Sequence, residues 1–204
     1  MKSLLTISSI LLLAISVTAR GGGEIPDYQA EQLTDHVWVI HGPTEFPNPQ
    51  NRGFMNNPAF VITSGGVVVI DPGSTLETGR MVLRQIGKVT DKPVTHVFAS
   101  HIHGDHWLGN HAIQEKYPEA RFYAHPQMIA QAHAGQAETW VDMLEQLTGG
   151  ASKGTVAVIP DQALEDGQEH NGHRQRKDQG SQKAMRQHRV QPIGGTGRHI
   201  SSAD

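Results

Sequence analysis

The chain has 204 residues, a formal net charge of −3, 37% hydrophobic residues and no cysteine. This length suits one domain with a sizeable core, and the missing cysteine excludes a disulfide framework, a cysteine-ligated zinc ribbon, an iron–sulfur protein and a cysteine-nucleophile enzyme. The near-neutral charge argues against a general nucleic-acid-binding protein. The chain nevertheless carries 13 histidines, and because histidine is the commonest metal ligand, their arrangement is the main clue to function.

Residues 1–19 have the pattern of a secretory signal peptide. Lys2 precedes an apolar run over residues 4–17, and small residues around Ala19 suit a cleavage site. Serine and threonine interrupt the run, which is also shorter than the roughly 20 apolar residues of a membrane span. We therefore expect an exported protein, periplasmic or secreted, with no stable membrane insertion after cleavage. A flexible leader over residues 20–32 is expected to precede the domain.

Residues 33–167 alternate between strand and helix patterns. Runs rich in β-branched and aromatic residues predict strands over residues 37–40, 59–63, 67–70, 94–99 and 121–124. The Gly-, Pro- and Asn-rich residues 42–58 predict a long loop, and residues 64–66 predict a hairpin turn. This order indicates an α/β or α+β layered domain.

Helix signals fall between these strands. Ser74, followed three residues later by Glu77, predicts a capping box that opens a helix to about residue 87. A shorter helix is expected before Pro118, and Pro126 opens a longer one. In that last helix the spacing of four apolar residues predicts a stripe facing the core: Trp140, Met143, Leu144 and Leu147.

Residues 168–204 have a different composition. This segment of 37 residues has six apolar residues, no aromatic residue, and seven basic against three acidic side chains. Such a sequence buries too little apolar surface to offset the entropy lost on ordering. We interpret it as a disordered basic tail, or as sequence foreign to the domain that a truncation or a change of reading frame has introduced.

The dense cluster of histidines follows the predicted strand that ends at Ala99, in a run that reads His-Ile-His-Gly-Asp-His. In an extended chain His101 and His103 point to the same side. Gly104 lets the backbone turn, so that Asp105 and His106 reach the same place. Imidazole and carboxylate groups are zinc ligands, and α/β sheets place ligands at the carboxyl ends of strands. The motif therefore predicts a metal site.

Together with the segment 57–62, the hairpin and the Asp71-Pro72-Gly73 turn, this motif resembles the metallo-β-lactamase superfamily over about residues 30–167. The secretory leader and the Asn-rich loop are similar, more weakly, to the zinc metallohydrolases associated with periplasmic quinoproteins. The resemblance implies a four-layer αββα sandwich, of which only the N-terminal half is recognisable here. It also implies that a metal-bound hydroxide hydrolyses an ester, thioester, lactam or similar bond of a small-molecule substrate.

The resemblance implies roles for individual residues. His101 and His103 would hold a first zinc ion, and Asp105 with His106 would hold a second, so that one or two ions are expected. Asp105 would also orient the attacking water, as the catalytic residue, and Asp71 would fix the ligand loop by hydrogen bonds.

The family also needs a third histidine, a bridging aspartate and a late histidine from its second half. His173 is nearest the expected place of the third histidine, but no small-residue turn or apolar strand surrounds it. No bridging aspartate can be assigned, because no aspartate in the tail follows an apolar strand.

Two alternatives stay open at this point. The same scaffold can hold a single iron ion for oxygen chemistry on persulfides, and a truncated chain would be a catalytically incomplete metal-binding fragment. The sequence does not predict an oligomeric state. His111 and His125 are interpreted as surface or helix-face histidines, and Trp107 as a residue that packs the ligand loop.

Overall fold

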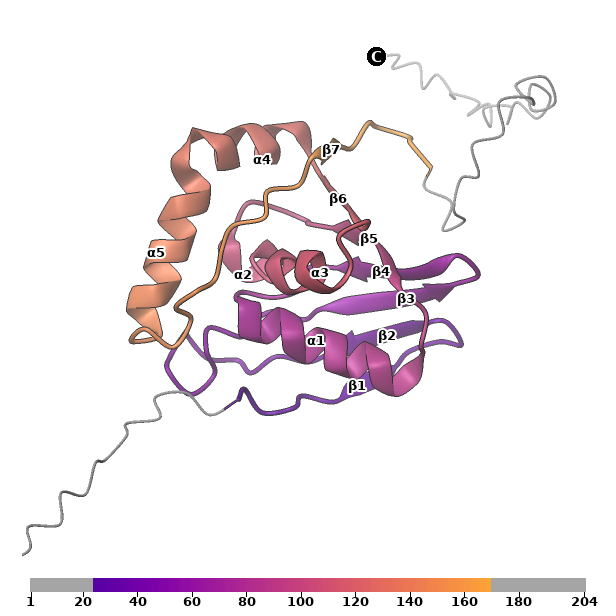
Figure 1. The fold of residues 1–204 in the computed structure, drawn as a ribbon, viewed down its shortest axis with the longest axis horizontal. Coiled ribbons are helices and arrows are strands. Elements are labelled where there is room, and N and C mark those ends of the chain that lie inside the picture. Colours follow the sequence, from indigo (N-terminus) through magenta and orange to yellow (C-terminus); the bar gives the residue numbers. More distant parts are fainter. Residues whose placement is uncertain (1–23, 170–204) are drawn as a thin grey trace, which may run out of the picture. The chain divides into compact units, whose positions relative to one another are not determined.

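A computed structural model describes residues 24–169 (Figure 1). The predicted signal peptide, nearly all of the predicted tail and His173 lie outside these residues. The strands are β1 (Ala30–Gln32), β2 (Val37–Ile40), β3 (Ala59–Thr63), β4 (Gly66–Ile70), β5 (Val94–Phe98), β6 (Arg121–Ala124) and β7 (Gln162–Ala163). The helices are α1 (Leu76–Val89), α2 (Gly104–Trp107), α3 (Asn110–Lys116), α4 (Pro126–Gln131), the π-turn η1 (Ala132–Gln136) and α5 (Ala137–Leu147). Within residues 24–169 no helix has the length and apolarity of a membrane span.

The strands form one seven-stranded sheet whose spatial order follows the chain from β1 to β7. Strands β1 to β4 pair antiparallel, whereas β4 to β7 pair parallel. In the parallel part Ile70 lies beside Phe98, and Phe98 lies beside Tyr123. The residues that follow these strands therefore meet at one edge of the sheet, where α/β folds place ligand sites.

One face of the sheet carries the main core. A single cross-strand row runs through Trp38, Phe60, Val69, Val97 and Phe122, and all five side chains are buried. They belong to the same buried cluster as four residues of α1 and two of α3: Met81, Val82, Leu83, Ile86, Ala112 and Ile113. Each large apolar side chain of this kind contributes about 1.5–3 kcal/mol when it is buried. Helices α1 and α3 lie over this face of the sheet (Figure 1).

The other face of the sheet is apolar but less covered. The neighbouring row of Val39, Ala59, Ile70 and Phe98 is half-buried. Alternation of this kind is expected when a sheet packs helices on one face and another layer on the second. Residues 24–169 therefore form one mixed sheet with helices over one face, which agrees with one sheet and its helices in the predicted αββα fold.

The ordered domain begins earlier than residue 33. Strand β1 pairs with β2 from Ala30 to Gln32, and Ile25 is buried in the main core. Both features lie within the segment predicted as a flexible leader. The sequence signal was weak because β1 has three residues, two of them exposed, and so shows no apolar alternation.

The cap of α1 is one residue away from the predicted one. Thr75 is the N-cap, and it forms a capping box with Thr78 rather than Ser74 with Glu77. The Ser74 hydroxyl instead donates to the carbonyl of Gly53, in the long loop over residues 42–58. A threonine at the third helical position can replace the usual acidic residue because its hydroxyl accepts the N-cap backbone N–H, at 2.8 Å.

The predicted core stripe of α5 is wrong for two of its members. Leu144 is buried, but Met143 is 37% and Leu147 is 48% exposed. The face that packs inward runs instead through Ala137, Val141 and Leu144. These residues also follow helical spacing. The apolar pattern therefore predicted the helix correctly but assigned part of its buried face to residues that are exposed.

Replacing the true cap should destabilise the domain. Thr75→Ala removes the hydroxyl that accepts the backbone N–H of Thr78 at the start of α1, at 3.2 Å, and should lower the free energy of unfolding by about 1–2 kcal/mol. Thr139→Ala, on the exposed side of α5, is the control and should change it by less than about 0.5 kcal/mol. Urea unfolding followed by circular dichroism measures both. Equal effects of the two variants would contradict the cap assignment.

Candidate metal centre

The predicted ligand residues follow β5: His101 and His103 lie before α2, and Asp105 and His106 lie within it. Helix α2 begins within the motif, with His103 at its N-cap position. Trp107 is fully buried below this segment, and its indole N–H donates to the carbonyl of Ile102 at 2.9 Å. This contact confirms that Trp107 packs the ligand loop, so the tryptophan holds the segment between the histidines in place.

The four predicted ligands lie together. The ring of His101 is 4.7 Å from that of His103 and 4.1 Å from that of His106, centroid to centroid. The Nε2 atom of His106 is 3.3 Å from Oδ2 of Asp105. His103 is exposed and the other three are half-buried, so solvent and small molecules can reach the cluster.

Gly104 has a different role from the predicted one. It does not have the positive φ of a glycine turn. A Cβ at this position would instead lie 2.8 Å from Cβ of Trp140 in α5, so the glycine permits close packing of α2 against α5. The Trp140 ring also lies 5.1 Å from that of His103. From the sequence, the helical spacing of Trp140 indicated only a core residue and gave no sign of this contact with His103.

Asp71 anchors the ligand segment from the end of β4. Its backbone amide donates to the carbonyl of Phe98, and its φ of 52° is uncommon for a residue with a side chain. Its Oδ1 accepts the backbone N–H of Ser100 at 2.8 Å, while its Oδ2 is 2.7 Å from the Ser100 hydroxyl. The same Oδ2 is 2.9 Å from Nδ1 of His106. One carboxylate thus holds both ends of the motif.

Two further residues belong to this arrangement and were not predicted. The Ser100 hydroxyl is 2.9 Å from Nδ1 of His101. The buried Asn56, in the long loop over residues 42–58, donates from Nδ2 to the carbonyl of Asp71 at 2.9 Å. The position of Ser100 directly before the motif was an available signal. Asn56 gave none, because its contact with Asp71 depends on how the loop folds back.

The charges of the metal-free cluster are coupled. Burial alone would lower the pKa of His106, but hydrogen bonds to Asp105 and Asp71 outweigh it and raise the pKa to about 9. Burial would raise the pKa of Asp71 and of Asp105, yet their hydrogen bonds with His106, and with Ser100 for Asp71, hold both below the usual value. Burial and the neighbouring His106 and His103 lower the pKa of His101. His106 is therefore an imidazolium between two carboxylates when no metal is bound.

One pair of donor atoms in the cluster has the spacing that a bound metal ion needs. Ligands at 2.0–2.1 Å from a tetrahedral zinc ion are about 3.3 Å apart, which is the separation of His106 Nε2 and Asp105 Oδ2. A carboxylate on the far nitrogen, as Asp71 provides for His106, is the usual support of a metal-bound histidine. Within residues 24–169, however, no three His, Asp or Glu side chains are grouped to hold one ion.

The other histidines considered have different surroundings. His111, in α3, accepts the backbone N–H of Val156 at 3.1 Å and lies 3.5 Å from Glu115. His125 caps α4 by accepting the N–H of Gln127 at 3.2 Å. Both therefore have structural partners away from the cluster, in keeping with their interpretation as helix-associated residues.

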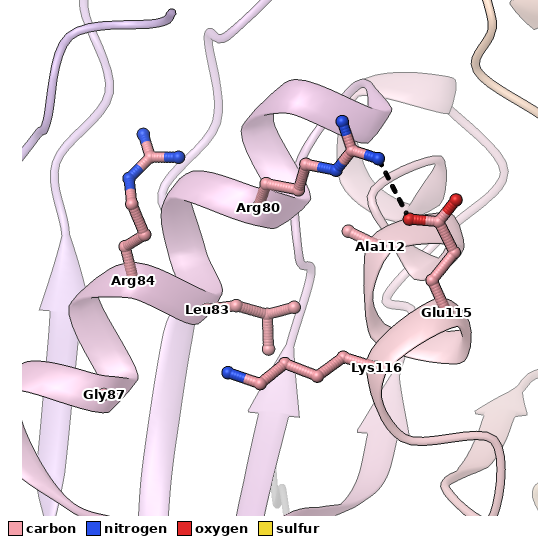
Figure 2. A pocket seen from close by; sticks show the side chains of 7 residues that line it. All are labelled: Arg80, Leu83, Arg84, Gly87, Ala112, Glu115 and Lys116. Carbon is pink, nitrogen blue, oxygen red and sulfur yellow. Dashed lines mark hydrogen bonds and ion pairs between the residues drawn. The ribbon is translucent and has the colours of Figure 1, made fainter.

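A separate pocket lies between α1 and α3 (Figure 2). It has a volume of about 490 Å³ and contains none of the candidate ligands; its walls are Arg80, Leu83, Arg84, Gly87, Ala112, Glu115 and Lys116. Arg80 is paired with Glu77 and Glu115 at 3.2 and 3.1 Å, and Arg84 with Asp27 at 2.8 Å. These ion pairs occupy both guanidinium groups, and the remaining cation of the walls is Lys116, whose Nζ lies 5.4 Å from the ring centroid of Tyr117.

Comparison with known proteins identifies relatives of this domain. The family model of the metallo-β-lactamase superfamily matches residues 52–178. A linear primary-alkylsulfatase of Pseudomonas sp. (strain ATCC 19151) is 32% identical over 68 residues, which are 31% of this chain and 13% of that protein.

Two solved structures are similar over most of the chain. A subclass B3 metallo-β-lactamase of Bradyrhizobium japonicum has 19% identity and a TM-score of 0.49, over 71% of this chain and 48% of that one. A metallo-β-lactamase from Pontibacter korlensis has 20% identity and a TM-score of 0.46, over 67% and 52%. The chain thus spans about half the length of these two proteins, and a much smaller part of the alkylsulfatase.

The charge of His106 should be visible in the metal-free protein. Its folded pKa of about 9 exceeds the value of 6.5 for an unperturbed histidine. Its contribution to stability is therefore complete below pH 6.5 and is lost as the pH rises through 9. An NMR titration of the histidine rings should show His106 titrating near 9 and His101 below 6.5. In Asp71→Asn the His106 value should fall; an unchanged value would contradict the ion pair.

Proposed function

Because the chain belongs to the metallo-β-lactamase superfamily, we propose that it acts as a zinc-dependent hydrolase on an ester, thioester, lactam or similar bond. The observation that carries this proposal is the convergence of four ligand-type side chains, His101, His103, Asp105 and His106, at the carboxyl end of β5. The Asp71 carboxylate is hydrogen-bonded to Nδ1 of His106, which is the usual support of a metal-binding histidine.

The residues divide into three tasks. His101 and His103 would hold a first zinc ion, and Asp105 with His106 would hold a second. A bound zinc ion supplies the chemistry of hydrolysis, because it lowers the pKa of a coordinated water towards about 7 and polarises a carbonyl oxygen. Asp105 would orient the attacking water through its carboxylate and accept its proton. Asp71 would keep His106 in the orientation that turns Nε2 towards the centre.

The substrate is proposed as a small molecule. The exposed His103 and the ring of Trp140 beside it form an accessible edge of the cluster. One relative is an alkylsulfatase and others are metallo-β-lactamases, so a first panel of substrates should hold an alkyl sulfate and a β-lactam beside simple esters and thioesters. The signal-peptide pattern of residues 1–19 supports a periplasmic or secreted site of action.

The test is an activity panel on purified full-length protein whose bound metals have been counted. We expect zinc-dependent hydrolysis of at least one probe, and His103→Ala should reduce turnover by at least about 100-fold, because it removes a ligand. His133→Ala is the matched control, since His133 is an exposed residue outside the motif; it should retain full turnover.

Three results would count against the proposal. Turnover retained in His103→Ala would refute the site assignment. One iron ion per chain with oxygen uptake would favour the oxygenase alternative. The absence of both hydrolysis and a zinc-dependent rise in the unfolding temperature would favour the incomplete metal-binding fragment.

A further inference from the structure

We infer that Ser100 is a positioning residue through which Asp71 sets the tautomer of His101, so that a single carboxylate aims two imidazoles at the candidate metal centre. The metal-binding consequence rests on the proposed function. The hydrogen-bond arrangement itself belongs to the metal-free protein. Neither Ser100 nor the link between the two histidines was apparent from the motif.

The chemistry of the three groups fixes the direction of each hydrogen bond. An ionised carboxylate can only accept, and a serine has one hydroxyl hydrogen. Because Ser100 Oγ is 2.7 Å from Oδ2 of Asp71, that hydrogen is committed to Asp71. The same Oγ is 2.9 Å from Nδ1 of His101, so it must accept there. Neutral His101 therefore carries its hydrogen on Nδ1 and a lone pair on Nε2.

Asp71 orients His106 in the same way, but by a direct hydrogen bond. Its Nδ1 is 2.9 Å from Oδ2 of Asp71 and donates to it. Its Nε2 points to Asp105 Oδ2, at 3.3 Å. Both His101 and His106 thus direct an Nδ1 hydrogen towards Asp71, one through Ser100 and one directly. Each ring would then bind a metal through Nε2, which on His106 must first lose the proton that faces Asp105.

The structure separates this role of Ser100 from an anchoring role. The backbone N–H of Ser100 donates to Oδ1 of Asp71 at 2.8 Å whatever side chain the residue carries. Ser100 is also exposed, so loss of its hydroxyl opens no cavity in the core. Ser100→Ala should therefore keep the loop in place and lose only the link to His101, whereas Ser100→Thr retains a hydroxyl at the same position.

The first measurement uses the metal-free full chain with ¹⁵N-labelled histidine rings, in which long-range ¹H–¹⁵N NMR spectra report the tautomer of each ring. In the unsubstituted protein we expect the Nδ1–H form for neutral His101. Ser100→Ala should shift His101 towards the Nε2–H form that imidazole prefers in water, without changing His106. Ser100→Thr should restore the Nδ1–H form, and Thr139→Ala, on exposed α5 surface, should change neither ring.

The second measurement is the affinity for zinc alone, by calorimetry. Ser100→Ala should weaken binding by about 10- to 100-fold, the usual effect of losing the support of a ligand, and Ser100→Thr should recover most of the affinity. The unfolding temperatures of the variants confirm that each remains folded.

The outcomes separate the inference from the proposed function. If Ser100→Ala leaves the His101 tautomer unchanged, the positioning role is overturned, whether or not the protein binds zinc or hydrolyses a substrate. If the tautomer changes as expected but the unsubstituted protein binds no zinc, the proposed function fails while the link from Asp71 through Ser100 to His101 stands. If both the tautomer and the affinity respond, Ser100 positions a ligand.

Discussion

The buried carboxylate of Asp71 is the constraint on which the candidate metal centre depends. Parallel pairing of β4 with β5 brings Asp71 beside the start of the ligand segment. Its oxygens then take hydrogen bonds from the Ser100 backbone, the Ser100 hydroxyl and the His106 ring. Removing one partner would leave the other charge partly buried without its counter-charge, so the geometry of the motif and the stability of this edge of the sheet are linked.

The three histidines of the motif are supported in two different ways. His101 and His106 are oriented by hydrogen bonds that lead back to Asp71, whereas His103 packs its ring against Trp140 of α5. Within the described part of the chain no three ligand-type side chains are grouped to hold one ion. The sheet and α2 nevertheless hold four ligand-type side chains together, and the imidazolium of His106 lies between the carboxylates of Asp105 and Asp71.

Much of this arrangement could be predicted from sequence, because local patterns encode it. The positions of β2 to β6 and of the hairpin followed from β-branched runs, whereas the short β1 and β7 gave no such signal. The candidate metal motif followed from its spacing directly after β5. What could not be predicted depends on tertiary contacts: the neighbours of Gly104 and the orientation of α5. The N-cap at Thr75 was missed because Ser74 fits the same capping pattern. The structure distinguishes the two residues, since the Ser74 hydroxyl bonds to Gly53 and Thr75 caps the helix. Asn56 reaches Asp71 through the folding of a long loop.

The most direct test of the central claim is a zinc titration of the metal-free full chain, followed through the ring signals of its histidines by NMR. If the Asp71-supported motif is the metal centre, the signals of His101, His103 and His106 should shift or broaden at the first additions of zinc. The ring signals of the other histidines in residues 24–169 should stay unchanged. Early changes in those other histidines, with the three motif rings unaffected, would contradict the assignment.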